Sequence, residues 1–230
     1  MTQTSIDLKK EHQRTLNTPR YKYSFAAKVF FFGMDLLAGK KDTLPKATLL
    51  EILASIPYRA WEIRHYMKQT KKYMNQHTVQ KSQDIIEWGR EAQDNEFMHL
   101  LVIQEKMAED GIKNTWYLSA FVRFFIVLSY IIIARTLAFF SQKRAFLFNA
   151  EFENHAELVY AKLTLDTPQW EEQPLTNSFV KTYYADVDTW ADVFRRISLD
   201  ERDHMNHSFE FCGKPEHIVK YEGMPETYNS

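Results

Sequence analysis

The sequence predicts an all-α protein, and two observations carry that prediction. Apolar residues recur at steps of three and four over most of the 230 residues, as on the buried side of amphipathic helices. Glycine (6) and proline (7) are scarce, and evenly spaced hairpin turns of the Asn-Gly or Asp-Gly type are absent. The length suits one domain, residues 1–230, with a substantial apolar core.

Six helices are expected, joined by short linkers and one long connection. The long connection covers residues 166–188, and Asp110-Gly111 is a typical helix C-terminus. Residues 1–20 should form a polar N-terminal arm and residues 213–230 a polar, loosely held tail. The expected helices are Tyr21–Leu37, Lys46–Met74, Val79–Glu109, Thr115–Phe140, Lys143–Leu165 and Thr189–Phe211.

Charge and cysteine content exclude several classes of protein. The formal net charge of −1 gives no reason to expect a nucleic-acid partner. The single cysteine, Cys212, excludes an intramolecular disulfide and a cysteine-cluster metal site, and we expect it to be inert packing or a partly exposed thiol. The first 20 residues are polar, so neither a secretory signal nor a transit peptide is expected.

Four of the apolar helical stripes carry a carboxylate near the middle, where an apolar residue would be expected. Burying these glutamates without cations would cost several kcal/mol each. Two of the stripes also carry a histidine three positions after the glutamate. The residues are Glu51, Glu96 with His99, Glu153, and Glu201 with His204.

The Glu-x-x-His spacing places both side chains on one helical face, about 4.5 Å apart along the axis. Two such helices and two single glutamates make the ligand set of a di-iron or di-manganese carboxylate bundle with a ferritin-like four-helix core. One Glu-x-x-His pair is common on solvated helices, but two pairs inside apolar stripes, alternating with lone glutamates, are not. Four carboxylates balance two divalent cations, and the oxygen-rich set suits iron or manganese better than copper or zinc. We therefore expect a two-metal site, with iron and manganese both open.

Four segments resemble the motifs of the alternative oxidase family. In that family the motifs read Leu-Glu-Thr followed by Val-Pro, Asn-Glu-x-x-His-Leu, a ligand glutamate with a tyrosine seven positions later, and Asp-Glu-x-x-His. Some details look closer to plastid and cyanobacterial terminal oxidases, although the loop before the last helix is short, as in the mitochondrial branch. The segments here are Leu50–Tyr58, Asn95–Leu101, Phe152–Tyr160 and Asp200–His204.

The resemblance implies a quinol:oxygen oxidoreductase that holds two Fe ions, pumps no protons and reduces O2 to water. Its substrate would be plastoquinol or ubiquinol, and two quinols would be consumed per dioxygen. Such enzymes are monotopic on a membrane and usually homodimeric. The family's arginine five positions before the first ligand is Lys46 here. The expected quinol-binding residues are Lys46, Leu50, Phe152 and Ala156.

Three further residues are expected to assist the site. Asn95 and Asp200 are candidates for orienting the ligand histidines. Tyr160 follows Glu153 by two helical turns and could transfer electrons or protons; spacing alone fits a core tyrosine equally well, and the resemblance favours the functional role. His65 and His155 are expected to be structural or solvated, and Trp88 and Trp190 to belong to the core.

The stretch Tyr117–Phe140 is the most apolar part of the chain. Arg123 and Arg135 stand 12 residues apart, about 18 Å of helix, against a hydrocarbon core of about 30 Å. Spanning would bury an arginine in lipid, so an interfacial helix is expected, which forms a monotopic membrane-binding face with the apolar first helix. The alternative is a buried helix of a soluble bundle. We expect the face to meet lipid on the cytoplasmic or stroma-like side.

Three other functions remain open. A di-iron hydroxylase of quinone biosynthesis would share the ligand pairs and the membrane attachment, but would not consume oxygen stoichiometrically with simple quinol. A ferritin-like iron-storage protein would use similar ligands, but its soluble shell does not suit the apolar helices. A non-enzymatic scaffold would tolerate loss of Glu96 or Glu201.

Overall fold

The computed structural model describes residues 6–19 and 21–224. Within these ranges the chain forms eight α-helices, three short 3-10 helices and no strand beyond an isolated bridge between Pro174 and Thr189. The prediction of an all-α protein is confirmed. The chain divides into two compact units, Leu44–Asn149 and the combination of Met1–Thr43 with Ala150–Ser230, and each is described by itself.

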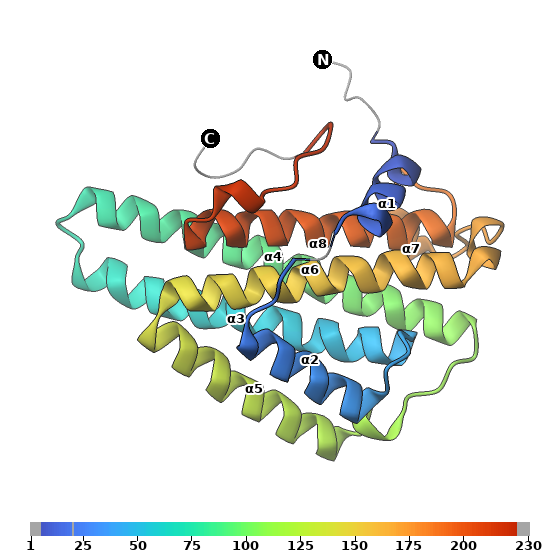
Figure 1. The fold of residues 1–230 in the computed structure, drawn as a ribbon, viewed down its shortest axis with the longest axis horizontal. Coiled ribbons are helices and arrows are strands. Elements are labelled where there is room, and N and C mark those ends of the chain that lie inside the picture. Colours follow the sequence, from blue (N-terminus) through green and yellow to red (C-terminus); the bar gives the residue numbers. More distant parts are fainter. Residues whose placement is uncertain (1–5, 20, 225–230) are drawn as a thin grey trace. The chain divides into compact units, whose positions relative to one another are not determined.

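The unit Leu44–Asn149 is built on two long antiparallel helices, α3 (Leu44–Lys71) and α4 (Gln76–Glu109), which lie side by side (Figure 1). The Asn75 side chain caps α4 by accepting the Thr78 N–H at 2.9 Å, and Gly111 follows the helix with a φ of 65°. A short 3-10 helix (Trp116–Leu118) leads into α5 (Ala120–Phe140), which packs on α3.

Aromatic side chains fill the core of this unit. The Trp61 ring stacks on Trp88 with centroids 5.4 Å apart and contacts Phe146, on the first turns of α6 (Gln142–Asp166), at 4.5 Å. Tyr58 packs edge-on against Trp61, and its hydroxyl accepts the Asn149 side-chain amide at 3.1 Å. The predicted core role of Trp88 is therefore confirmed.

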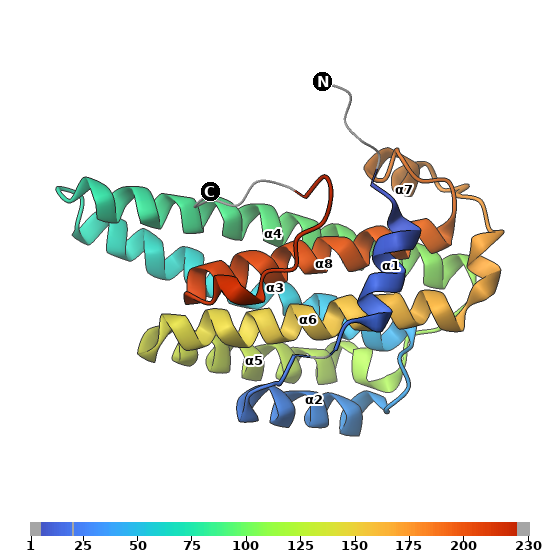
Figure 2. The ribbon, with the colours of Figure 1, turned by 45° about the horizontal axis from the view of Figure 1, so that its top comes forward.

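The other unit contains α1 (Leu8–Asn17), α2 (Phe25–Ala38), the rest of α6, α7 (Ser178–Tyr183) and α8 (Trp190–Cys212). Two further 3-10 helices lie at Pro168–Glu171 and Pro215–His217. Most of α8 is buried, Trp190 included, and α1 crosses it (Figure 2). Thr189 caps the start of α8, and Gly213, with a φ of 79°, ends it in the left-handed conformation that glycine tolerates best.

The expected polar arm contains a helix that apolar periodicity did not predict. The buried face of α1 is polar: the His12 ring hydrogen-bonds the Ala161 carbonyl at 2.8 Å, and the Thr15 hydroxyl donates to Glu157 at 2.8 Å. A helix that packs through hydrogen bonds leaves no apolar stripe to detect.

The described part of the tail also differs from the expectation of a loosely held segment. The Tyr221 hydroxyl donates to the Asp203 carboxylate at 2.7 Å, and the Asn206 side chain pairs with both backbone groups of Val219. These contacts fix the tail on α8 as far as residue 224.

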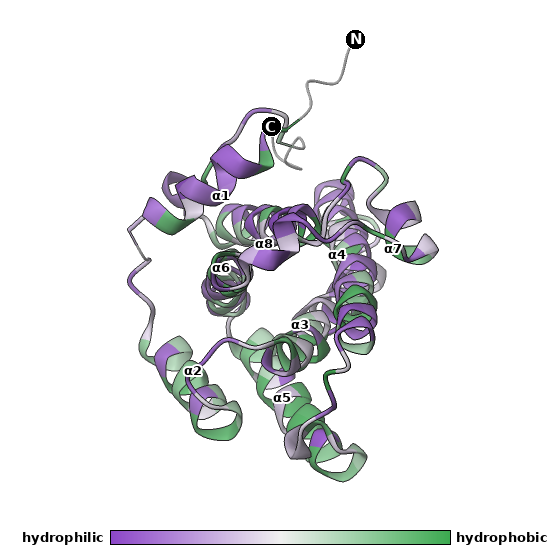
Figure 3. Cartoon of the chain, turned by 90° about the vertical axis from the view of Figure 1, so that its right-hand side faces the viewer, coloured by the Kyte–Doolittle hydropathy of each residue, from purple (hydrophilic) through white to green (hydrophobic). Residues whose placement is uncertain are grey.

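Two helices present apolar side chains outward, and both are mainly hydrophobic in Figure 3. By length and composition α5 could cross a membrane, and 11% of its most apolar window is buried. On α2, Phe25, Phe32 and Leu36 are at least 70% exposed. The exposed large side chains of α5 are Phe121, Phe124, Phe125, Leu128, Ile132, Ile133, Phe139 and Phe140.

Candidate metal centre

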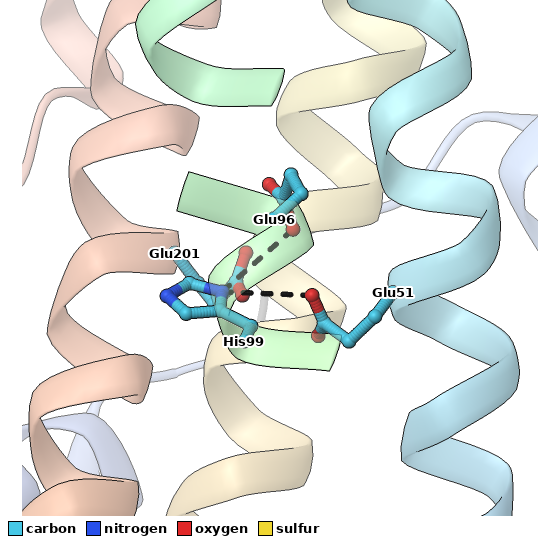
Figure 4. A group of neighbouring side chains, drawn as sticks. All are labelled: Glu51, Glu96, His99 and Glu201. Atoms are coloured by element: carbon cyan, nitrogen blue, oxygen red, sulfur yellow. Dashed lines mark ion pairs between the residues drawn. The ribbon is translucent and has the colours of Figure 1, made fainter. Parts of the chain in front are cut away.

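One group of candidate ligands lies within the unit Leu44–Asn149. Helix α3 supplies Glu51 and α4 supplies Glu96 and His99, and each side chain is at most 2% exposed. The His99 Nδ1 atom lies 3.5 Å from the Glu51 carboxylate and 3.7 Å from that of Glu96 (Figure 4). Their ligand atoms all lie within 4.8 Å of one another. We call these three residues the α3–α4 triad.

The other unit holds a second group of the same composition. Helix α6 supplies Glu153 and α8 supplies Glu201 and His204, and these side chains are 0%, 0% and 7% exposed. The His204 Nδ1 atom lies 3.8 Å from the Glu201 carboxylate. The ligand atoms again lie within 4.8 Å of one another. We call these three residues the α6–α8 triad.

Helical periodicity explains why each triad is buried. On α4, Ala92 and Ile103 stand one turn before Glu96 and one turn after His99, and both are at most 2% exposed. On α8, Ile197 and Ser208 flank Glu201 and His204 in the same way and are fully buried. The stripes expected from the sequence are therefore the buried faces of these helices, carboxylates included.

The donor atoms of each triad fit a divalent cation. Two carboxylates this close repel each other, and burial removes the water that would screen them. A cation removes both penalties, and two carboxylates with a neutral imidazole carry the charge that balances one M²⁺ ion. A mixture of carboxylate oxygen and imidazole nitrogen suits iron or manganese.

The two residues expected to orient the histidines have different surroundings. Asp200 is buried on α8, where it pairs with Arg196 at 2.8 Å and accepts the Tyr184 hydroxyl at 3.3 Å. The charge of Asp200 is the main reason why the pKa of Arg196 is raised. Asn95 is half-buried directly before Glu96. The orienting role of both residues stays a prediction.

Tyr160 is fully buried on α6, with its ring stacked on Phe194 of α8 at 6.1 Å. The expected quinol-binding residues are buried as well: Lys46 and Leu50 on α3 in one unit, Phe152 and Ala156 on α6 in the other. Phe152 contacts Phe30 of α2 with ring centroids 5.7 Å apart. The functional roles of these residues also stay predictions.

A cavity of about 580 Å³ lies next to α2 and α6. His155, two residues after Glu153, stacks on Phe31 at 4.1 Å on its border. From the sequence, His155 looked like a structural or solvated histidine, because nothing indicated that α2 packs beside it. The other lining residues are Tyr23, Lys28, Phe32, Asp35, Leu36 and Lys40.

A buried ionic network joins α1 to the helices of the α6–α8 triad, and the sequence did not predict it. The Arg202 guanidinium donates to Glu157 at 2.9 Å, to Thr15 at 2.7 Å and to the Glu11 carboxylate. Burial raises the pKa of Glu157, against the opposing effect of the Arg202 charge. The sequence positions of two residues could have indicated this network. Glu157 stands one helical turn after Glu153, and Arg202 directly follows Glu201.

Comparison with known proteins agrees with this site. The alternative oxidase family matches residues 2–212, which include both triads. No individual curated protein matches the chain. Alternative oxidases are membrane-associated di-iron oxidases that act on quinol and dioxygen. The match extends over nearly the whole length and over all six candidate ligands, so this chain belongs to the alternative oxidase family.

Proposed function

We propose that this chain oxidises a membrane quinol, plastoquinol or ubiquinol, and reduces dioxygen to water with two irons, one held by each triad. Two quinols release four electrons and four protons, which convert one O2 into two water molecules. The observation that carries the proposal is the repetition of one buried ligand set, two carboxylates and an imidazole, in each compact unit.

The α3–α4 triad would hold one iron and the α6–α8 triad the other. When bound, the irons supply redox electrons and Lewis acidity. The chain's own contribution is a dry site, since the six ligands are at most 7% exposed. Tyr160, two turns beyond Glu153, is proposed to hold a proton or an electron at its hydroxyl.

The cavity beside α2 and α6 is the proposed entry for the quinol ring. Phe31 and Phe32 offer aromatic faces, and His155 offers a hydrogen-bond acceptor two residues from Glu153. Lys46, Leu50, Phe152 and Ala156 are proposed as further quinol contacts because the family resemblance implies them. The exposed apolar side chains of α2 support an approach from lipid, where a quinol's apolar tail resides.

The apolar surfaces of α2 and α5 support interfacial, monotopic attachment rather than a spanning helix, because Arg123 and Arg135 lie within α5. From the family resemblance we also propose that the chain attaches to the membrane from the cytoplasmic or stroma-like side and forms a homodimer.

Oxygen uptake by the iron-loaded protein with a short-chain quinol tests the proposed function. We expect one O2 consumed per two quinols, and a loss of at least a hundredfold in kcat for Glu96→Gln. Glu109→Gln, which removes an exposed carboxylate from the same helix, is the matched control and should retain full activity. Absence of uptake by the wild type would contradict the proposal. A ring-hydroxylated product would favour the hydroxylase alternative.

A further inference from the structure

Five consecutive residues of α6, 151–155, include the ligand Glu153 and also hold α2 in place. The His155 ring stacks on Phe31 of α2 with centroids 4.1 Å apart. Four of these five residues contact α2 or the two residues that precede it, and the fifth is the ligand. The other contacts join Phe152 to Phe30, Asn154 to Tyr23, and Glu151 to Ser24.

Helix α2 buries little apolar surface that could hold it there. Of its 14 residues, all of which the structure describes, three are buried, and Phe25, Phe32 and Leu36 are among those that face outward. Its first turn contains no acidic residue, although the N-terminus of a helix is the positive end of the helix dipole. The position of α2 therefore depends strongly on polar contacts at its N-terminus.

The Glu151 carboxylate of α6 supplies this missing negative charge. It accepts the Ser24 backbone N–H and the Ser24 hydroxyl, each at 2.6 Å. The same hydroxyl accepts the Ala27 N–H at 3.3 Å and so caps α2. Glu151 is 1% exposed, so water does not compete for these contacts, and hydrogen bonds to a charged group are about twice as strong as neutral ones.

The position of α2 also determines the shape of the cavity of about 580 Å³ beside it. Of the described residues that line this cavity, His155 belongs to α6 and all others belong to α2 or to the residues that flank it. A shift of the α2 N-terminus would separate the Phe31 ring from His155 and remove most of the cavity wall.

We propose that Glu151 is a positioning residue for quinol binding, which fixes the N-terminus of α2 so that Phe31 and His155 keep the cavity in its binding shape. The inference rests on the proposed function, because it takes the quinol ring to be the occupant of this cavity. Only molecules with α2 in this position bind the ring, so the apparent affinity falls in proportion to their fraction.

Hydrogen–deuterium exchange of the full chain, followed by mass spectrometry, measures the anchor without any turnover. We expect the amides of the first two turns of α2 to exchange at least tenfold faster in Glu151→Ala, because both hydrogen bonds to Ser24 are lost. Glu151→Gln should stay close to the wild type, since its amide can accept the N–H and donate to the hydroxyl. The matched control is Asp7→Ala, which removes the side-chain cap of α1 and should leave α2 unchanged.

Equilibrium binding of a short-chain quinone, and oxygen uptake by the iron-loaded protein with the corresponding quinol, measure the consequence. Glu151→Ala should raise the Kd of the quinone and the KM of the quinol at least threefold, while kcat and iron content change less than twofold. Glu151→Gln should restore most of the affinity, and Asp7→Ala should retain all of it. A merely structural role would lower Tm without this difference between KM and kcat.

Three results would overturn the inference. Unchanged exchange of α2 in Glu151→Ala would mean that Glu151 is not its anchor, and faster exchange with an unchanged quinone Kd would mean that the anchor does not serve the cavity. A fall in kcat and iron content at constant KM would assign Glu151 to the metal site instead. A wild type that binds quinone but consumes no oxygen would contradict the proposed oxidase and leave the inference standing, whereas a wild type that binds no quinone would refute the inference as well.

Discussion

Replacement of Arg202 by methionine tests the buried ionic network that holds α1 against α6 and α8. Arg202 is 1% exposed and serves two buried carboxylates, Glu157 and Glu11, as well as the Thr15 hydroxyl. Methionine fills similar volume without a charge, so Glu157 would remain buried without its cation, whereas Glu11 would keep its ion pair with Arg14 at 3.6 Å. Removing one partner of such a buried pair typically costs about 3–5 kcal/mol.

For a chain of this size, that loss corresponds to a fall in Tm of about 6–20 °C. The loss should depend on pH. Burial already raises the pKa of Glu157, and without Arg202 it rises further. The penalty is absent below the unfolded pKa of this carboxyl and complete above its folded pKa, so destabilisation grows as pH rises. Thermal unfolding followed by circular dichroism at pH 4.5 and pH 7.5 measures both effects.

Two further variants decide what the result means. Arg90→Met breaks an exposed pair with Glu62 and should cost less than about 1 kcal/mol. Arg202→Met combined with Glu157→Met removes one stranded carboxylate and should recover part of the lost stability. If Arg202→Met were no more destabilising than Arg90→Met, the buried network would not hold α1.

Three further predictions follow from single features. Burial, with nearby cations, lowers the pKa of His65 to about 4. The neutral ring therefore contributes about 3 kcal/mol to the free energy of unfolding above the unfolded pKa, and this contribution is lost as pH falls through about 4. His65→Gln should make the free energy of unfolding less dependent on pH between pH 6.5 and 4. Phe124→Asp with Ile132→Asp on exposed α5 positions should weaken co-sedimentation with lipid vesicles at least tenfold without lowering Tm. Gly213 has a φ of 79°, so Gly213→Ala should lower the free energy of unfolding by about 1 kcal/mol. Gly89→Ala should not lower it, because the added Cβ would lie 3.5 Å from the Tyr58 carbonyl oxygen, an ordinary contact distance. Chemical denaturation compares the two variants.

The helices that carry the ligands could be predicted because their buried faces consist of apolar residues at helical spacing. The expected Val79–Glu109 corresponds to α4 at Gln76–Glu109, and Lys143–Leu165 to α6 at Gln142–Asp166. The glutamates were recognisable because they interrupt these stripes, and a charge inside a stripe is costly unless a cation binds it.

The features that were not predicted depend on contacts between segments far apart in the sequence. Helix α1 packs through Thr15 and His12, whose partners lie more than 140 residues away. The tail is fixed to α8 by the Tyr221 hydroxyl, which donates to Asp203, and by the hydrogen bonds between Asn206 and Val219. The periodicity of apolar residues indicates which helix faces are buried, but it does not predict such polar contacts.

The central claim is that each triad binds one iron. Iron analysis with X-ray absorption spectroscopy of the iron-loaded chain tests it most directly. The claim predicts about two irons per chain, bound by oxygen and nitrogen donors, in the wild type and in Glu109→Gln, and about one in Glu96→Gln. One iron per chain in the wild type, or two irons in Glu96→Gln, would contradict it, because the α3–α4 triad would then not hold an iron.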